Sequence, residues 1–301
     1  MQPYEMVGLF IFASLALVPL LPFTCFLRQY IFLKTYRNAT TRNRLLISAV
    51  IMLVVYVVVC IDAFWIEPNW VQITRINLKA DLTSPLKILH LSDLHIERNF
   101  PKREQWLIGQ IQELSPDLIL ITGDIHQMDN FDAVSCRRIL EQIKAPLGVY
   151  GVVGYDNIGL LSEARPGLVM LRDETVVVEH NGDQISITGV YTPSKANDTC
   201  AKAIGVQYRI ALNHTPDLAD IVAQNNMDLY MCGHTHGGQV RIPFWGGIIT
   251  NAESGKRYEA GLYRNENTWI YTSRGLGLEP RPAPQVRFLC RPEITLITLL
   301  P

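Results

Sequence analysis

The sequence predicts an α/β domain preceded by two transmembrane helices. Two long apolar stretches lie in the first 70 residues, which hold only eight of the 27 Lys or Arg and 28 Asp or Glu residues. Beyond residue 70, short apolar runs alternate with amphipathic segments, which is typical of an α/β domain with partly mixed sheets. Two packed sheets with helices outside them would accommodate the expected number of strands.

The composition excludes several classes of protein. The chain has 301 residues, of which 48% are hydrophobic and 18% charged, and its mean hydropathy is +0.12. Soluble domains carry about 25% charged residues; here the charged fraction is lowest in the first 70 residues, at about 11%, against about 20% in the rest of the chain. The remainder is long enough for one large soluble domain, which argues against a polytopic transporter. A formal net charge of −1 argues against a nucleic-acid-binding protein.

Residues 7–27 carry no charge, and residues 45–66 are apolar apart from Asp62. A membrane span needs about 20 apolar residues, so both stretches are expected to cross the bilayer, with Asp62 at the interface near Trp65 and Trp70. The alternative is a cleaved signal peptide followed by a buried helix. The first six residues hold no Lys or Arg, whereas a signal peptide begins with basic residues.

The loop between the two stretches predicts the orientation of the chain. Five basic residues and no acidic residue lie within residues 28–44. The positive-inside rule keeps such a loop in the cytoplasm. Both termini and the C-terminal domain are therefore expected on the extracytoplasmic side.

Residues 71–86 are polar and end near Pro85, so they are expected to connect the anchor, residues 1–70, to a domain at residues 87–301. Buried strands are predicted at residues 88–91, 118–121, 149–153, 185–190, 209–212, 229–232, 269–272 and 294–299. Periodic segments predict helices at residues 103–114, 131–143 and 218–224.

Acidic and histidine side chains follow four of these strands. In an open α/β sheet, ligands gather at the carboxyl ends of the strands, so these side chains are expected to meet. Burying them is costly unless they pair or bind a metal, and their oxygen and nitrogen donors suit Mn, Fe or Zn. The candidate ligands are Asp93, His95, Asp124, His214, His234 and His236.

The spacing of these residues supports the same interpretation. Side chains two residues apart on an extended segment point the same way, so Asp93 and His95 can reach one ion. His234 and His236 can do likewise, or two ions can divide them. A two-metal arrangement would hold the attacking and leaving oxygens of a phosphoryl displacement and activate a water.

The ordered motifs resemble those of the calcineurin-like metallophosphoesterases over about residues 86–300. They are Ser92-Asp93-Leu94-His95, Gly123-Asp124, Asn213-His214 and Gly233-His234-Thr235-His236-Gly237-Gly238. The tail at residues 273–277 and 292–294 is similar to that of the membrane-linked bacterial branch, which implies a location in the bacterial inner membrane.

The resemblance implies a four-layer α/β/β/α sandwich with a dinuclear centre of two divalent metal ions. Carried over to this sequence, Asp93, His95 and His236 would bind the first metal. His214 and His234 would bind the second, and Asp124 would bridge the two.

One motif departs from the family pattern. Where the family has Gly-Asn-His-Asp, this chain has Gly154-Tyr155-Asp156-Asn157. The family's Asn binds the second metal, and its His stabilises the transition state or protonates the leaving group. Tyr155 is a poor metal ligand and is expected near the substrate. Asp156 would bind the second metal or act as general acid; the alternative is a weakened or inactive second site.

Three further features are candidates for contact with substrate or lipid. His126 shares the side of Asp124 on an extended segment and is expected to face the substrate. Arg241 is expected either to contact phosphate oxygens or to form a surface salt bridge. The apolar loop 242–249, with Phe244 and Trp245, is expected to meet lipid or to pack beneath a loop.

We therefore expect a membrane-anchored, metal-dependent phosphoesterase that hydrolyses a phosphate ester or a pyrophosphate, with the anchor and the apolar loop favouring a lipid-linked substrate. One alternative is a UDP-2,3-diacylglucosamine pyrophosphatase of lipid A synthesis, which would require the domain on the cytoplasmic face. The other is a non-catalytic metal-binding membrane module with a degraded second site. The sequence makes no prediction of the oligomeric state.

Overall fold

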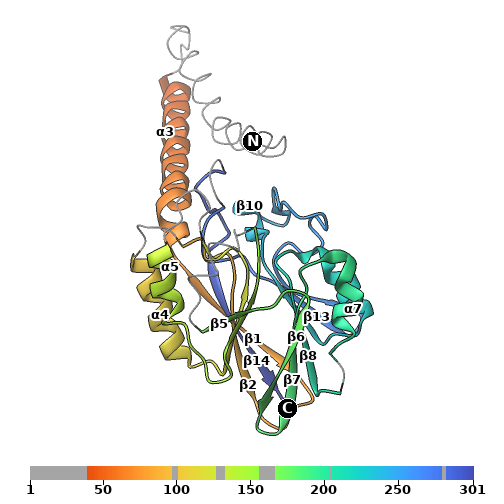
Figure 1. Cartoon of the computed structure of the whole chain (residues 1–301). Helices are drawn as coiled ribbons and strands as arrows, with labels where there is room; N and C mark the ends of the chain where they lie inside the picture. The colour runs from red at the N-terminus through yellow and green to blue at the C-terminus, as the bar shows by residue number, and fades with distance from the viewer. Residues whose placement is uncertain (1–38, 97–100, 127–132, 156–166, 204, 280–282) are drawn as a thin grey trace.

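The computed structural model describes residues 39–96, 101–126, 133–155, 167–203, 205–279 and 283–301. Two six-stranded sheets form the body of the domain (Figure 1). The first sheet has the order β1-β14-β2-β3-β4-β5, with β1 (Gln72–Lys79), β14 (Glu293–Leu300), β2 (Leu86–Leu91), β3 (Leu118–Thr122), β4 (Val149–Val152) and β5 (Leu168–Met170). The second has the order β12-β13-β9-β8-β7-β6, with β12 (Gly261–Asn265), β13 (Thr268–Thr272), β9 (Leu229–Cys232), β8 (Tyr208–Leu212), β7 (Asp183–Gly189) and β6 (Glu174–His180).

Both sheets are mixed. In the first, β2, β3, β4 and β5 are parallel, and β14 is antiparallel to β2 but parallel to β1. In the second, β7, β8, β9 and β13 are parallel, and β6 and β12 pair antiparallel at its edges. A separate hairpin is formed by β10 (Arg241–Ile242) and β11 (Gly246–Gly247). The expected mixed α/β fold is thus confirmed.

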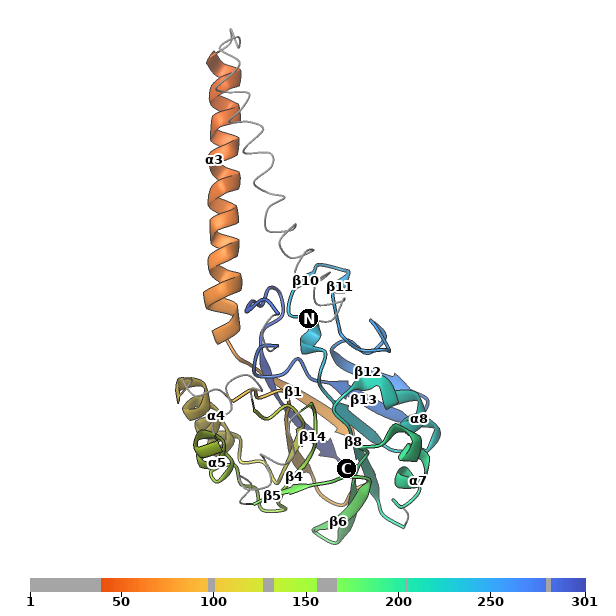
Figure 2. The ribbon, with the colours of Figure 1, turned by 45° about the horizontal axis from the view of Figure 1, so that its top comes forward.

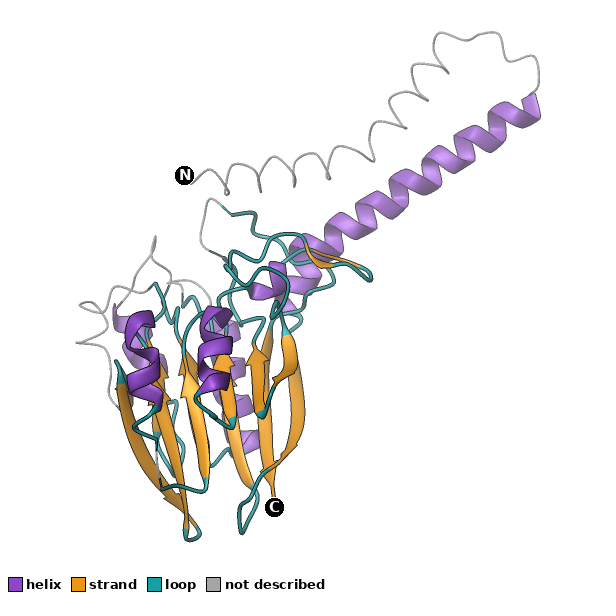
Figure 3. Cartoon of the chain, turned by 90° about the vertical axis from the view of Figure 1, so that its right-hand side faces the viewer, coloured by secondary structure: helices purple, strands orange, loops and turns teal. Residues whose placement is uncertain are grey.

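The sheets pack face to face, and helices cover their outer faces (Figures 2 and 3). Ile88 and Leu120 point between the sheets, where they meet Ile187 and Ile210 of the second sheet. On the other side of the first sheet lie α4 (Pro101–Leu114) and α5 (Ala133–Leu140). The second sheet is covered by α7 (Ala196–Cys200) and α8 (Ala219–Gln224).

This layering explains why the central strands read as continuous apolar runs. In β3, Leu118 and Leu120 face the other sheet, whereas Ile119 and Ile121 face the helices. Because both faces are buried, neither set of alternate positions can be polar. The strands predicted from such runs are all present, with ends that differ from the prediction by at most two residues.

Residues 71–86, expected to be a connector, contain strand β1. It pairs in parallel with β14 over its whole length, from Gln72 opposite Glu293 to Lys79 opposite Leu300. As an edge strand with a half-exposed surface, β1 lacks the dense apolar run that marks its neighbours. The sheet therefore begins about 15 residues before the domain boundary expected at residue 87.

The second apolar stretch is helical. It forms α3 (Ala39–Ile61), continued by the short turns η1 (Asp62–Ile66) and η2 (Glu67–Asn69). Within the described residues, one helical segment, Leu46–Asn69, is long and apolar enough to cross a membrane by length and composition. The first predicted span, residues 7–27, lies outside the described residues, so the expectation of two transmembrane helices is not confirmed.

Candidate metal centre

The six candidate ligands follow the carboxyl ends of β2, β3, β8 and β9. Five of them have left-handed backbone conformations, with φ between 42° and 68°. Such angles are uncommon outside glycine, although Asp and His tolerate them, and strained backbone of this kind clusters at functional sites. The five are Asp93, His95, Asp124, His234 and His236.

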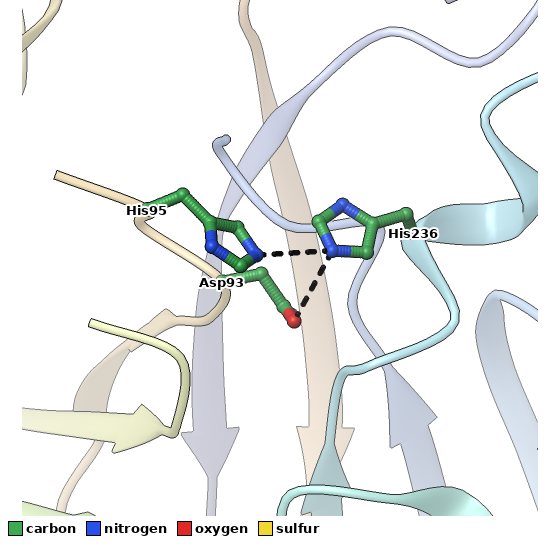
Figure 4. A group of neighbouring side chains, drawn as sticks. All are labelled: Asp93, His95 and His236. Atoms are coloured by element: carbon green, nitrogen blue, oxygen red, sulfur yellow. Dashed lines mark hydrogen bonds and ion pairs between the residues drawn. The ribbon is translucent and has the colours of Figure 1, made fainter. Parts of the chain in front are cut away.

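Three buried side chains form the first ligand group. Figure 4 shows Asp93, His95 and His236 pointing toward one another. The Nε2 atoms of the two histidines lie 3.3 Å apart, and His236 Nε2 lies 3.5 Å from Asp93 Oδ1. One donor atom from each residue lies within 4.8 Å of the others, which is close enough to share one ion.

A second group adjoins the first and shares Asp93 with it. It consists of Asp93, Asp124 and His214, whose donor atoms also lie within 4.8 Å of one another. Asp124 Oδ2 is 3.4 Å from His214 Nε2 and 3.8 Å from His95 Nε2, so this carboxylate contacts both groups. His214 Nδ1 donates to the carbonyl oxygen of Thr122 at 2.8 Å, which turns Nε2 toward the carboxylates.

His234 lies beside the second group. Its ring centroid is 5.0 Å from that of His214, and its backbone N–H donates to both carboxylate oxygens of Asp93, at 3.1 and 3.2 Å. Its Nε2 donates to the carbonyl oxygen of Asn251 at 3.1 Å, which leaves Nδ1 with the lone pair. His234 is thus oriented by a backbone carbonyl, as metal-binding histidines commonly are.

The charge state of the site fits divalent cations. Burial lowers the pKa of His95 to about 4 and that of His236 well below its usual range, so both imidazoles are neutral. Two neutral imidazole nitrogens then face each other beside a carboxylate, and a cation between them would use both lone pairs. Nitrogen and carboxylate oxygen donors of this kind suit Mn, Fe or Zn.

The second group shows the same need for positive charge. Burial raises the pKa of Asp93. Burial also opposes ionisation of Asp124 and His214, but their mutual attraction prevails: the pKa of Asp124 falls below its usual range and that of His214 rises to about 10. A proton on His214 therefore balances the carboxylates, and a divalent cation would replace it.

A chain of buried hydroxyl groups holds Asp93 in place. Ser92 Oγ donates to Asp93 Oδ2 at 2.5 Å, and Thr122 Oγ1 donates to Ser92 Oγ at 2.8 Å. Since the Thr122 proton is used in that bond, His90 Nε2 must be the donor in its 2.8 Å contact with Thr122 Oγ1. His90 is thus a buried supporting residue and not a member of either ligand group.

The predicted substrate contacts near the second group lie as follows. Tyr155 is 62% exposed, and its ring centroid lies 5.5 Å from that of His214 and 5.2 Å from that of His234. Its backbone N–H donates to Asp124 Oδ1 at 2.7 Å. Asp156, expected either to bind the second metal or to act as general acid, lies outside the described residues.

The other two predicted contacts are less open than expected. His126 is only 2% exposed and lies near enough to His95 to act on its pKa. Arg241 donates through Nη2 to Glu259 Oε1 at 2.8 Å and through Nη1 to the carbonyl oxygen of Gly237 at 2.9 Å. Of the two alternatives left open for Arg241, the structure contains the salt bridge.

Two residues near the first group escaped the sequence reasoning. Glu279 Oε2 lies 3.2 Å from His236 Nε2. Arg287 is fully buried, with Nη2 at 3.5 Å from His236 Nδ1, and it donates to the carbonyl oxygens of Arg274 and Gly277 at 2.8 and 2.6 Å. Glu279 follows the Gly-Leu-Gly tail motif, so its sequence position could have marked it as a site residue. Arg287 is an isolated arginine in a loop, and no sequence pattern marks it.

Residues 86–238 match the calcineurin-like phosphoesterase family. This chain belongs to that family. It is 32% identical to the uncharacterized metallophosphoesterase YkuE of Bacillus subtilis, over 79% of this chain and 88% of the relative. It is also 32% identical to the phosphodiesterase YaeI of Escherichia coli, over 78% and 90%. The UDP-2,3-diacylglucosamine pyrophosphatase LpxG of Chlamydia trachomatis is 26% identical, over 78% and 91%.

Family membership makes this chain a metallophosphoesterase, a hydrolase of phosphoric esters. Calcineurin-like phosphoesterases use a dinuclear divalent metal centre, and the two adjoining ligand groups are the candidates for it here.

Proposed function

We propose that this metallophosphoesterase is membrane-anchored and hydrolyses a phosphate ester or pyrophosphate. In its metal centre, Asp93, His95 and His236 would bind one ion, and His214 and His234 would bind another. Asp124 would bridge the two ions. The observation that carries the proposal is the convergence of donors from four strand ends, with the Nε2 atoms of His95 and His236 only 3.3 Å apart.

Two divalent ions in such a site lower the pKa of an attacking water and neutralise charge on the phosphoryl oxygens. The protein's part is to hold the donors rigidly. The Ser92 hydroxyl and the His234 N–H fix the Asp93 carboxylate, and the Tyr155 N–H fixes that of Asp124. We propose that Asp156 protonates the leaving group, in place of the family's histidine.

The membrane anchor is proposed from α3. The helical segment Leu46–Asn69 has 24 residues, and only 11% of the residues in its most apolar 18-residue stretch are buried. At 1.5 Å per residue it is about 36 Å long, against an apolar bilayer thickness of about 30 Å. Val50, Ile51, Val54 and Val58 each expose half or more of their surface, which suits lipid better than water. With residues 7–27 as a first span, the basic loop would lie in the cytoplasm and the domain outside it.

A lipid-linked substrate is the second part of the proposal. LpxG is a pyrophosphatase of a diacylated nucleotide sugar, and its similarity extends over most of both chains. Cleavage of UDP-2,3-diacylglucosamine is therefore the second candidate activity, and it would require the domain on the cytoplasmic face.

Activity is tested on the purified full chain in detergent with added Mn²⁺. Hydrolysis of bis-p-nitrophenyl phosphate, absent from an Asp124→Asn variant, is the expected result. No turnover above that variant, on this ester and on lipid phosphates, would leave the non-catalytic alternative. Elemental analysis of the same sample should give two ions per chain.

Sidedness and substrate are tested separately. Protease added to intact spheroplasts should digest the domain; a domain that survives until the membrane is lysed would reverse the proposed orientation. Release of UMP from UDP-2,3-diacylglucosamine by the full chain, together with a protected domain, would favour the LpxG-like activity.

A further inference from the structure

One end of the domain exposes large aromatic side chains beside the base of α3. Trp65 and Trp70, at the end of the helical segment, are 66% and 58% exposed. Phe244 and Trp245, at the tip of the β10–β11 hairpin, are fully exposed and 66% exposed. Figures 1 and 3 show the hairpin at the end from which α3 projects, opposite the C-terminus.

Hydrogen bonds fix the base of α3 to the domain at this end. The buried Glu67 carboxylate accepts the backbone N–H groups of Leu289, at 2.8 Å, and of Cys290. The N–H of Arg287 donates to the carbonyl oxygen of Ala63 at 3.0 Å. These bonds attach the base of α3 directly to residues 287–290 of the domain.

The same segment, residues 287–291, also holds the hairpin. The N–H of Arg241 donates to the carbonyl oxygen of Phe288 at 2.9 Å, and Val240 pairs with Phe288 as an isolated bridge. Leu289, 51% exposed, lines a groove together with Phe244 and Trp245. The hairpin tip and the helix base are therefore parts of one structural unit.

Cations accompany two of these aromatic rings. Lys256 Nζ lies 4.3 Å from the ring centroid of Trp245, and Arg291 Cζ lies 4.0 Å from that of Trp70. Tryptophan concentrates in the headgroup layer of membranes, and nearby Lys and Arg attract anionic lipid phosphates. This pairing suits a surface that is partly apolar and partly in contact with phosphates.

We infer that Phe244 and Trp245 insert into the headgroup layer of the bilayer that α3 crosses. The inference rests on the proposed function in one respect, that α3 spans the membrane. The hairpin begins five residues after His236, and Arg241 is bonded to the carbonyl oxygen of Gly237. Seating the hairpin in lipid would thus hold the metal centre close to the membrane surface, where the phosphate of a lipid-linked substrate lies.

Tryptophan quenching tests the insertion directly. The full chain is reconstituted in phosphatidylcholine–phosphatidylglycerol vesicles with or without bromine on the acyl chains. Bromolipid should quench the emission of the wild type more than that of the Trp245→Phe variant. The control is Trp269→Phe, which removes a ring from β13 in the second sheet. Its emission should be quenched as much as that of the wild type, or more. A Trp245 signal that bromolipid leaves unchanged and aqueous acrylamide quenches would overturn the inference. A signal protected from both quenchers would also overturn it, and would mean that residues 1–38 or a second copy covers the hairpin.

Activity separates this inference from the proposed function. A Phe244→Ser, Trp245→Ser double variant should hydrolyse bis-p-nitrophenyl phosphate at the wild-type rate. With a phosphodiester lipid in the same vesicles, its turnover should fall severalfold. Equal turnover of the vesicle substrate by both proteins would count against insertion. If the wild type itself does not hydrolyse the soluble ester, the phosphoesterase function is refuted instead. Resistance of the chain to alkaline carbonate extraction tests the membrane anchor independently of both, and release of the chain by carbonate would refute the anchor.

Discussion

His95 and His236 are 141 residues apart in the chain, yet their Nε2 atoms lie 3.3 Å from each other and their rings stack with centroids 5.2 Å apart. One follows β2 of the first sheet, and the other follows β9 of the second. The first ligand group therefore joins the two sheets, and a metal ion held there would tie them together.

Removing either imidazole should therefore remove a metal ion. We expect His236→Ala to bind one ion per chain fewer than wild type and to lose at least about 100-fold in kcat/KM, since loss of residues that merely support ligands already costs 10–100-fold. Elemental analysis after gel filtration measures the ion content. His180→Ala, which changes a half-exposed histidine on β6 away from the ligand groups, is the matched control and should retain both ions. Full metal content in His236→Ala would remove this residue from the ligand set.

The hydroxyl chain behind Asp93 makes a second prediction. Ser92→Ala removes the 2.5 Å bond to Asp93 and leaves the buried Thr122 hydroxyl without its acceptor. We expect metal affinity to fall about 10–100-fold, the usual effect of losing an outer partner of a ligand. Isothermal titration of the metal-free protein with Mn²⁺ measures this. Ser186→Ala, at an equally buried serine whose Oγ makes no hydrogen bond among the described residues, should bind like wild type.

Gly233 is required by close packing at the same carboxylate. A Cβ atom at this position would collide with Ser92 Oγ and Asp93 Oδ2. We expect Gly233→Ala to cost about 1–3 kcal/mol of stability through overpacking and to impair metal binding. Gly109→Ala is the control, because a Cβ there in α4 meets nothing within 4 Å and should stabilise the helix by about 1 kcal/mol. Thermal unfolding in detergent compares the two; equal stability of both variants would contradict the collision.

The candidate ligands, and their meeting at one place, were predictable from sequence because their chemistry is local. Each stands within four residues of the end of a strand whose apolar run is long enough to identify, and strand ends of an α/β fold meet. The supporting contacts were not predictable in this way. The His90–Thr122–Ser92 chain depends on the register of β2 against β3, in which His90 lies opposite Leu120. That register is set by packing and cannot be predicted from the sequence of either strand alone.

Arginines were the least predictable part of the site. Arg241, for which the sequence left a phosphate contact and a salt bridge open, pairs with Glu259, and Arg274 pairs with Glu293. Arg287, which has no motif, is the fully buried one beside His236. A guanidinium is placed by whichever carboxylates and carbonyls the fold brings near it, and those partners lie far away in sequence.

Glu293 should stabilise the junction of the two sheets in a pH-dependent way. It accepts bonds from Arg274 Nη2 at 2.5 Å, Thr74 Oγ1 at 2.6 Å and Tyr271 OH at 3.0 Å. Burial raises its pKa, but Arg274 and these bonds outweigh that effect, so the pKa lies below the usual range. Glu293→Gln should cost about 3–5 kcal/mol at neutral pH, because it leaves the largely buried guanidinium of Arg274 without its carboxylate partner.

The sign of the pH effect follows from the lowered pKa. A carboxylate with a depressed pKa in the folded state contributes stability above its unfolded pKa of about 4.3, and this is lost as the pH falls through the folded value. The thermal midpoints of wild type and Glu293→Gln should therefore differ most near pH 7 and converge in acid. Glu141→Gln, which breaks the exposed 3.9 Å pair with Arg137, should change the midpoint little at any pH. A constant difference across the pH range would contradict the role of the ionised carboxylate.

Tyr155 stands where the family has a metal-binding asparagine, and this substitution can be reversed. Its ring contacts the rings of His214 and His234, so a side chain at this position points toward the proposed second metal, while its backbone N–H holds Asp124 regardless of the side chain. Tyr155→Asn should place an amide oxygen there and bind the second ion more tightly than wild type, since a carboxamide oxygen is a donor for hard divalent ions and a neutral phenol is a poor one. Tyr155→Ala removes the ring without supplying a donor and is the control for opening the site. In metal titrations, the affinity for the second ion should rise for the Asn variant alone. An equal rise in both variants would mean that the tyrosine ring blocks the ion. No change in either variant would place the second ion out of reach of residue 155.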